Sequence, residues 1–342
     1  MAFGLLFLVA GAEMMVRGAV ALAARLKIRP LIVGLSIVAF GSSAPQLAVS
    51  LRAVTEGAPD IAVGSVIGGN IFSVLVTLGC CALITPLRVS RQVVRMDLPL
   101  MIAANVLVFA LVLNENLGRF EGAVLLVGLA VYLLILLRQS QRHGRTFSNR
   151  GSPPHPLRSG ALFLVGSAVM IQGSHWLLEG TVEVATDLGL SERIIGLTVV
   201  GVGAALPEFA TCMLAVMRGQ RDLAVGNVIG SNLFNLLGVL GLSAVVAPEA
   251  LSISPNALSF DLPVMLGVTV LVLPLFYAGH QITRLEGLVM LGLYAAYGLH
   301  VITFTFGMPQ ANRLEHLMLF YVLPILAVIL FWRGTATWRK RH

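Results

Sequence analysis

Glu208 is the residue of this chain that could bind a cation most directly, because it is a lone carboxylate inside a long apolar segment. It follows Pro207 in a stretch that we predict to be helical and to cross a membrane. An ionisable group at that depth costs about 2.5–3.5 kcal/mol on insertion scales, and it marks a functional site by default. The structural alternative is a protonated or paired carboxyl group that holds two helices together.

The same segment occurs a second time, 162 positions earlier. Residues 34–79 match residues 196–241 without a gap, and about half of the paired positions are identical. Gln46 stands at the position of Glu208 and carries no charge. A duplicated apolar segment with proline, glycine and a carboxylate indicates a transporter whose binding site lies between two repeats.

Neutral oxygen ligands accompany both copies. Ser42, Ser43 and Gln46 share one helix face, and Pro45 lacks an N–H, which frees a carbonyl one turn earlier. Hydroxyl, amide and carbonyl oxygens suit a hard cation such as sodium or calcium. A proline-kinked helix whose serines bond to their own backbone is the alternative. The next apolar segment of each copy adds Asn70, Ser73, Ser231, Asn232 and Asn235.

The composition shows which elements position these residues. The chain is 57% hydrophobic and 11% charged, whereas about 25% of the residues in soluble domains are charged. A spanning helix needs roughly 20 apolar residues. We predict an all-α polytopic membrane protein with two inverted-topology repeats of five transmembrane helices and one extra C-terminal helix. The predicted spans, about eleven, are 3–24, 30–54, 60–84, 97–114, 119–137, 160–185, 192–217, 222–246, 260–278, 282–305 and 315–332.

A basic stretch with several prolines, 138–159, divides the chain into a first repeat at 1–137 and a second at 160–305. The additional helix at 315–332 precedes a basic tail at 333–342. An odd number of helices separates the two copies, so the second copy enters the membrane from the opposite side. Inverted repeats can exchange conformations about a central site, as alternating access requires.

The charges predict an orientation in the cytoplasmic (inner) membrane. With the basic stretch and the tail in the cytoplasm and the N-terminus outside, the inner loops are rich in arginine and the outer loops are mostly acidic, as the positive-inside rule requires. This distribution explains the net charge of +7 better than nucleic-acid binding does. The first apolar run indicates a membrane helix, since it lacks the basic start and cleavage site of a signal peptide.

Two GxxxG pairs, Gly64/Gly68 and Gly226/Gly230, predict close helix packing. No strand precedes them, so they do not indicate a nucleotide-binding loop. Glu13 and the position that matches it in the second half, His175, are further ionisable residues in predicted spans. They suggest either a proton relay or a position near a helix interface or a water-accessible vestibule.

The three cysteines, Cys80, Cys81 and Cys212, lie inside predicted spans without zinc-ligand spacing, and we expect them to be packing residues. No Ser/His or paired-aspartate arrangement occurs in the spans, and no HExxH motif is present. These features argue against a membrane-embedded enzyme.

The duplicated segments resemble the alpha-repeats of the calcium/cation antiporter superfamily, the sodium/calcium exchanger family, in its prokaryotic type. Its hallmark is a pair of inverted motifs, G-T-S-x-P-E, each followed by G-N-x-x-G-S-N-x-x-N, and the resemblance covers roughly residues 1–305. It implies that the glutamate after each proline binds calcium, while nearby hydroxyls and polar residues of the following helix complete calcium and sodium sites. The matching positions are Ser42, Ser43, Gln46, Gly69 and Ser73 in the first copy and Ala204, Ala205, Glu208, Ser231 and Asn235 in the second.

Several of these positions depart from the family pattern. Gln46 replaces one of the two glutamates, and Ala204-Ala205 replace a Thr-Ser pair. Gly69 replaces a serine and Ser73 an asparagine, while Asn235 is neutral where some members carry an acid. One carboxylate compensates only half of the charge of calcium, whose desolvation cost is large.

The hypothesis that follows is a secondary cation antiporter, most similar to sodium/calcium exchangers, that moves an ion through a midplane site by alternating access. The first and sixth helices would slide or rock. We expect inorganic cations (Ca²⁺ and Na⁺, or H⁺) and the lipid bilayer as partners, no nucleic acid and no tightly bound cofactor. The alternatives are a proton- or monovalent-cation-coupled carrier with one site carboxylate, and a non-transporting family member with a regulatory or structural role. The oligomeric state is left open.

Overall fold

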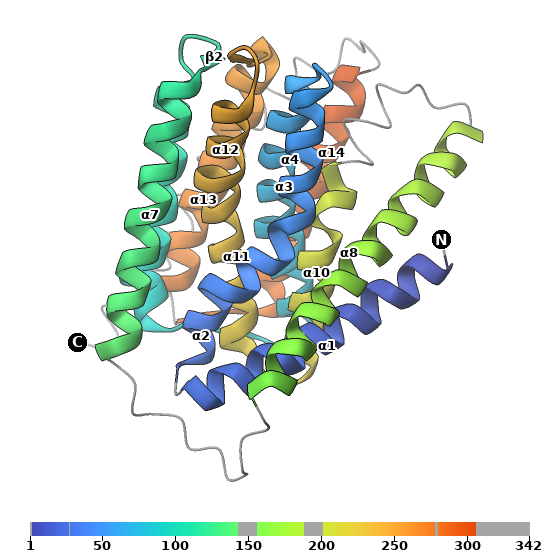
Figure 1. Cartoon of the computed structure of the whole chain (residues 1–342). Helices are drawn as coiled ribbons and strands as arrows, with labels where there is room; N and C mark the ends of the chain where they lie inside the picture. The colour runs from blue at the N-terminus through green and yellow to red at the C-terminus, as the bar shows by residue number, and fades with distance from the viewer. Residues whose placement is uncertain (1, 27, 143–155, 188–200, 278–279, 306–342) are drawn as a thin grey trace.

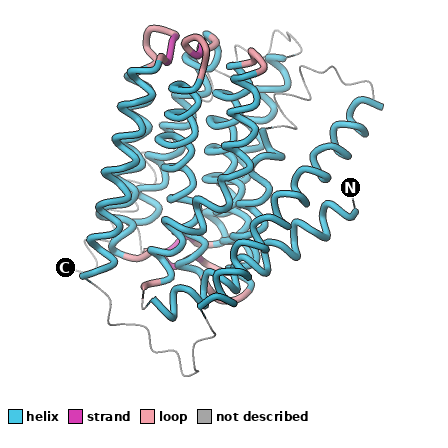
Figure 2. The backbone as a smooth tube through the Cα atoms, in the orientation of Figure 1, coloured by secondary structure: helices cyan, strands magenta, loops and turns pink. Residues whose placement is uncertain are grey.

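The computed structural model describes residues 2–26, 28–142, 156–187, 201–277 and 280–305 (Figure 1). These residues are almost entirely helical, and their strands form only two short pairings at the helix ends (Figure 2). The α-helices are α1 (Ala2–Leu26), α2 (Pro30–Val33), α3 (Ala39–Thr55), α4 (Pro59–Phe72), α5 (Leu78–Ile84), α6 (Leu98–Leu111), α7 (Arg119–Arg142), α8 (Pro156–Asp187), α10 (Gly201–Met217), α11 (Arg221–Phe234), α12 (Leu240–Val246), α13 (Leu262–Tyr277) and α14 (Arg284–Thr305). The π-helical turns are η1 (Gly34–Val38), η2 (Ser73–Thr77), η3 (Val93–Asp97), η5 (Asn235–Val239) and η6 (Ala257–Asp261), and the strands are β1 (Leu87–Arg88), β2 (Asn116–Leu117), β3 (Leu251–Ser252) and β4 (Gln281–Ile282).

The helices have the length and composition of membrane spans. Within the described residues, 9 helical segments are long and apolar enough to cross a membrane, and a shorter apolar helix covers Val202–Met217. These segments confirm the all-α membrane fold and fall on the first ten predicted spans. The predicted helix at 315–332 lies outside the described residues. α7 and α8 extend into the range assigned to the basic linker, whose centre is also outside the described part.

Equivalent elements recur in the two halves. η2 and η5 begin at Ser73 and Asn235, positions that match in the sequence repeat. The turns after α3 and α10 each place a glycine at positive φ, Gly57 at 78° and Gly219 at 76°. Glycine adopts this conformation without the steric cost that a side chain would add. The duplication is therefore present in the backbone as well as in the sequence.

Each of the two strand pairings joins one half of the molecule to the other. β1 of the first half pairs antiparallel with β4 of the second, while β3, the equivalent of β1, pairs with β2, the equivalent of β4. Two contacts that interconvert when the halves are swapped are the mark of a pseudo-two-fold relation. This relation supports the prediction of inverted repeats.

Glycines let the two halves approach closely at equivalent places. Gly79 and Gly287 bring α5 against α14, since a Cβ atom at Gly79 would lie 3.1 Å from the Gly287 carbonyl oxygen. Gly122 and Gly241 do the same for α7 and α12, where a Cβ atom at Gly122 would lie 2.7 Å from the Gly241 oxygen. The residue pairs are again equivalent, because Gly79 matches Gly241 in the sequence repeat and Gly122 and Gly287 are each the fourth residue of their helix. Small residues are what close helix approach in membranes requires.

The two GxxxG pairs behave differently. Cβ atoms at Gly226 and Gly230 would lie 2.6 and 2.5 Å from the carbonyl oxygens of Leu31 and Leu35, so the predicted close packing is confirmed for this pair. At Gly64 and Gly68 no described atom lies within 4 Å of the added Cβ. The positions that would mirror Leu31 and Leu35 fall within 188–200, outside the described residues.

α1 and α8 form a pair that crosses the remaining helices obliquely (Figure 1). A Cβ atom at Gly4 would lie 2.9 Å from the Gly173 carbonyl oxygen, and one at Gly11 would lie 2.7 Å from the Gly166 oxygen. Gly4 is equivalent to Gly166 and Gly11 to Gly173. Swapping the halves therefore converts the Gly4/Gly173 contact into the Gly11/Gly166 contact. The two helices pack backbone to backbone at both places.

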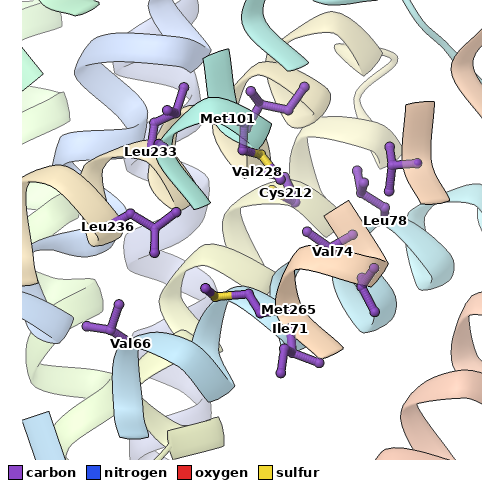
Figure 3. Packing of buried hydrophobic residues seen from close by; sticks show 14 of the residues in the cluster. Val66, Ile71, Val74, Leu78, Met101, Cys212, Val228, Leu233, Leu236 and Met265 are labelled. Atoms are coloured by element: carbon purple, nitrogen blue, oxygen red, sulfur yellow. The ribbon is translucent and has the colours of Figure 1, made fainter. Parts of the chain in front are cut away.

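The interior is filled by buried apolar side chains from both halves (Figure 3). Val66, Ile71 and Val74 come from α4 and η2, and Val228 and Leu236 come from α11 and η5. Branched side chains that pack closely against one another keep the helices in a defined arrangement. The polar side chains described next lie within this apolar surround.

Candidate ion-binding site

Four helices position the predicted site residues. α3 and α10, which carry Gln46 and Glu208, pack against each other, and each of them contacts both α4 and α11. α4 supplies Asn70, and α11 supplies Ser231 and Asn232, while Ser73 and Asn235 begin the π-helical turns η2 and η5 that follow these helices. The structure therefore brings the sequence-predicted segments of both copies together, as the repeat predicted.

The asparagines form the direct link between the two halves. Asn70 Nδ2 donates a hydrogen bond to the backbone carbonyl of Asn232 at 3.3 Å, and Asn235 Nδ2 donates to Asn70 Oδ1 at 3.0 Å. Asn232 Nδ2 donates to the Val228 carbonyl at 2.8 Å. Because all three asparagines are at most 3% exposed, these bonds offset a desolvation cost that would otherwise destabilise the junction.

Gln46 is held by a residue of its own half. Its Nε2 donates to Ser65 Oγ at 3.2 Å, and Ser65 Oγ donates to the Ala62 carbonyl at 3.0 Å. The Gln46 side chain lies against Gly69, where an added Cβ would be 3.3 Å from Oε1. The serine that the family pattern places at position 69 would therefore crowd this amide, so Gly69 and Gln46 fit each other.

Ser42 forms a hydrogen bond with a residue of the other half. Its Oγ donates to Asn227 Oδ1 at 3.0 Å and also lies 3.3 Å from the Ala39 carbonyl oxygen. Asn227 Nδ2 contacts Cys212 Sγ at 3.2 Å. The equivalent of Ser42 is Ala204, which has no hydroxyl and cannot form the matching bond. The two halves of the site are thus chemically different.

Ser65 and Asn227 are contact residues that the sequence reasoning missed. They are equivalent positions of the two copies and are almost fully buried. Each lies inside a GxxxG pair, which we interpreted only as a packing motif. A polar residue repeated at the same position in both copies was the available signal.

Glu208 lies on α10, the helix that contacts α3, α4 and α11, and is 3% exposed. The hydroxyl groups of Ser73 and Ser231 lie near its carboxyl group, while Ser231 Oγ donates to the Val228 carbonyl at 3.1 Å. Glu208 Oε1 has no hydrogen-bond partner among the described residues. A buried carboxylate oxygen without a donor is costly unless a cation or a proton meets it.

Other buried oxygens of the predicted site are also without a partner in the described residues. They are Ser43 Oγ, Ser73 Oγ and Asn235 Oδ1. Native structures leave few such atoms unsatisfied, and each one calls for an explanation such as a bound ion or water. Oxygen atoms from hydroxyl, amide and carboxylate groups are the ligand set of hard cations. No group of three or more His, Cys, Asp or Glu side chains occurs among the described residues, so neutral oxygens would have to complete any such site.

Glu13 and His175 lie apart from this cluster. Glu13 Oε1 pairs with Arg17 Nε at 2.6 Å and with Arg218 Nη2, at the interface of α1 and α10. It borders an open apolar hollow of about 500 Å³ that is lined mainly by α1, with Leu214 as the contribution of α10. His175 Nδ1 lies 3.3 Å from Glu179 Oε2 on the exposed side of α8. Of the interpretations offered for Glu13, the structure supports a position at a helix interface.

Comparison with known proteins gives a consistent result. A sequence model of the family described as "Sodium/calcium exchanger protein" matches residues 1–138 and 158–303. The chain is 36% identical to "Inner membrane protein YrbG" of Escherichia coli over 277 residues, which is 78% of this chain and 85% of the relative. It is 28% identical to "Sodium/calcium exchanger MaX1" of Methanosarcina acetivorans over 334 residues, covering 86% and 95%.

The fold resembles a solved structure as well. The sodium-calcium exchanger NCX_Mj, soaked with 2.5 mM Na⁺ and 0.1 mM Ca²⁺, superimposes with a TM-score of 0.74 and 25% sequence identity. The match covers 89% of this chain and 96% of that chain. The likeness therefore extends over both halves of the molecule and is not limited to the duplicated motifs.

Proposed function

The chain belongs to the sodium/calcium exchanger protein family, and from this membership we propose that it is an antiporter that carries a cation through a site between α3, α4, α10 and α11. Glu208, Gln46, Ser42, Ser43, Ser73, Asn70, Ser231, Asn232 and Asn235 would line that site. The proposal rests chiefly on Glu208 and the other unpartnered buried oxygens of the helices that meet at the junction of two equivalent halves. A carboxylate in this position attracts a cation, and the neutral oxygens replace part of its hydration shell.

Calcium and sodium are the ions we propose as substrates, because the relatives matched over most of their length include a sodium/calcium exchanger. Their binding would be competitive, since both use the same carboxylate. Exchange then follows when the site opens in turn to each side of the membrane. The lone carboxylate makes proton or monovalent-cation coupling the alternative outcome of the test below.

The orientation that we propose places the N-terminus outside and the C-terminal tail in the cytoplasm. β1 and β4 bring together chain segments that lead to Arg91 and Arg284 at the following helix starts, whereas β2 and β3 bring together segments that carry Glu115 and Glu249. Loops predicted to share a side of the membrane are therefore neighbours. The name of the Escherichia coli relative supports an inner-membrane location.

The test is calcium-45 uptake into sodium-loaded proteoliposomes, with the wild type beside Glu208→Gln. We expect uptake that depends on the sodium gradient and is lost in Glu208→Gln. Glu183→Gln serves as the matched control, because Glu183 is an exposed glutamate on α8. Uptake that persists in Glu208→Gln would contradict the proposed site. Wild-type protein that transports no calcium but exchanges protons for sodium would establish the alternative coupling. The absence of transport of any of these ions would support the non-transporting role.

A further inference from the structure

An ion pair joins the oblique helix pair to the rest of the molecule. Glu13 of α1 contacts Arg218, which follows the last residue of α10, and the contact spans two elements that are far apart in the sequence. The Glu13 side chain is 23% exposed. Glu13 also lines an open apolar hollow whose other lining residues are five residues of α1 and Leu214 of α10.

The two residues of this ion pair have equivalents in the opposite halves of the repeat. Glu13 is equivalent to His175, and Arg218 is equivalent to Glu56. The turns agree in detail, because Arg218 N donates to Leu214 O at 3.0 Å and Glu56 N donates to Arg52 O at 2.9 Å. An acid stands opposite a basic residue in both pairs: Glu13 faces Arg218, and its equivalent His175 would face Glu56. The equivalent pair is therefore also complementary in charge. An imidazole N–H can donate to a carboxylate whether the ring is neutral or charged.

His175 and Glu56 are paired with other residues in this structure. His175 Nδ1 lies 3.3 Å from Glu179 Oε2, and Arg52 Nε lies 2.8 Å from Glu56 Oε1. Both interactions join residues four apart on one helix, and all four side chains are more than half exposed. Exposed pairs of this kind contribute only about 0.3–0.5 kcal/mol, so His175 and Glu56 are available for a stronger contact.

The oblique pair can shift as one body. α1 and α8 contact each other backbone to backbone at Gly4/Gly173 and at Gly11/Gly166, whereas α1 meets the end of α10 through the Glu13–Arg218 ion pair, beside an open apolar hollow lined mainly by α1. The two helices are equivalent, so Glu13 and His175 occupy corresponding places on them. In a protein built from two inverted halves, exchanging the conformations of the halves yields the second access state. That exchange would carry the ion pair from one end of the molecule to the other.

We propose that Glu13–Arg218 and His175–Glu56 are alternating latches, of which the first holds the conformation seen here and the second closes when α1 and α8 shift. The inference rests on the proposed antiport function, because only a carrier with two access states needs both contacts. It assigns to His175 and Glu56 a positioning role away from the ion-binding residues. It also explains why complementary groups occur at these equivalent positions.

Cross-linking in proteoliposomes tests the latches. The double variants Glu13→Cys/Arg218→Cys and His175→Cys/Glu56→Cys are made in protein whose native cysteines are serine. A short bifunctional methanethiosulfonate reagent is used, because a direct disulfide needs Cα atoms within about 7 Å and a glutamate–arginine pair can span more. Mass spectrometry counts the bridges under calcium, under sodium and without either ion. His175→Cys/Asp60→Cys is the control, since Asp60 is exposed at the start of α4 and is not the equivalent of Arg218.

We expect both latch pairs to be bridged well above the control, with conditions that favour one bridge disfavouring the other. Each bridge should stop cation exchange, and a reductant should restore it. A His175/Glu56 pair that is bridged no better than the control under every ion condition would overturn the proposal, as would both bridges forming in one molecule that carries all four cysteines. Cation exchange without the second bridge would refute the latch alone. Alternating bridges in a protein that exchanges no cation would refute the antiport function alone.

Discussion

Asn70 and Asn232 occupy the same position in the two halves and are bonded to each other, with Asn70 Nδ2 lying 3.3 Å from the Asn232 carbonyl oxygen. Equivalent residues of a pseudo-two-fold structure can meet only where the axis passes. The two asparagines therefore mark the junction about which the halves are arranged. Asn235, which donates to Asn70 at 3.0 Å, ties the beginning of η5 to the same point.

Asn70→Ala should destabilise the protein. The change removes the two hydrogen bonds that Asn70 forms with the other half and leaves the amide of Asn235 buried without its acceptor, which costs about 1–3 kcal/mol. We expect a lower midpoint of thermal unfolding in detergent. Asn114→Ala is the control, because Asn114 is exposed in a loop and surface changes usually stay within about 0.5 kcal/mol. Equal midpoints for the two variants would show that the asparagine link adds no stability.

Asn227→Ala should weaken cation binding more than it slows turnover. The change removes the acceptor that orients the Ser42 hydroxyl, and one buried hydrogen bond is worth about 0.5–1.5 kcal/mol. We therefore expect KM for the transported cation to rise by up to about tenfold, with kcat less affected. Cys212→Ala, which removes the other partner of Asn227, should leave KM nearly unchanged. A similar rise in both variants would point to general loosening of the packing.

Gln46→Glu should raise the affinity for calcium. A second carboxylate opposite Glu208 would compensate the double charge of the ion, and an increase of about tenfold corresponds to about 1.4 kcal/mol. The measurement is competition by calcium against sodium-dependent transport in proteoliposomes. Gln46→Leu, which has a similar size but no oxygen, should lower the affinity. If Gln46→Glu binds calcium no better than the wild type, the position does not contribute to the charge of the site.

Gly11→Ala should disturb the oblique helix pair. The added Cβ would lie closer than 3.0 Å to backbone atoms of α8, and overpacking of this kind costs about 1–3 kcal/mol. We expect reduced thermal stability and slower exchange. Gly160→Ala on α8 is the matched control, since no described atom lies within 4 Å of its added Cβ and alanine favours a helix by up to about 1 kcal/mol over glycine. Stability lost equally in both variants would indicate that helix propensity, and not the α1–α8 contact, is responsible.

The fold could be predicted largely from the sequence, because a membrane leaves few choices. Backbone groups must be satisfied inside each span, so long apolar segments become helices, and a repeat separated by an odd number of spans must be inverted. The π-helical turns at Ser73 and Asn235 could not be predicted. They arise where one extra residue is accommodated in a continuous helix, and no local residue type marks that event.

The sequence by itself determined which residues could form the site. Glu208, Gln46 and the serines and asparagines of both motifs follow from residue type, depth in an apolar segment and duplication. Their partners were decided only by the tertiary structure. Ser42 binds Asn227, 185 positions away, whereas Gln46 binds Ser65, 19 positions away. The reason is that hydrogen bonds in the apolar interior form between whichever polar groups the helix packing brings within reach, and that packing depends on contacts between the halves that no single segment encodes.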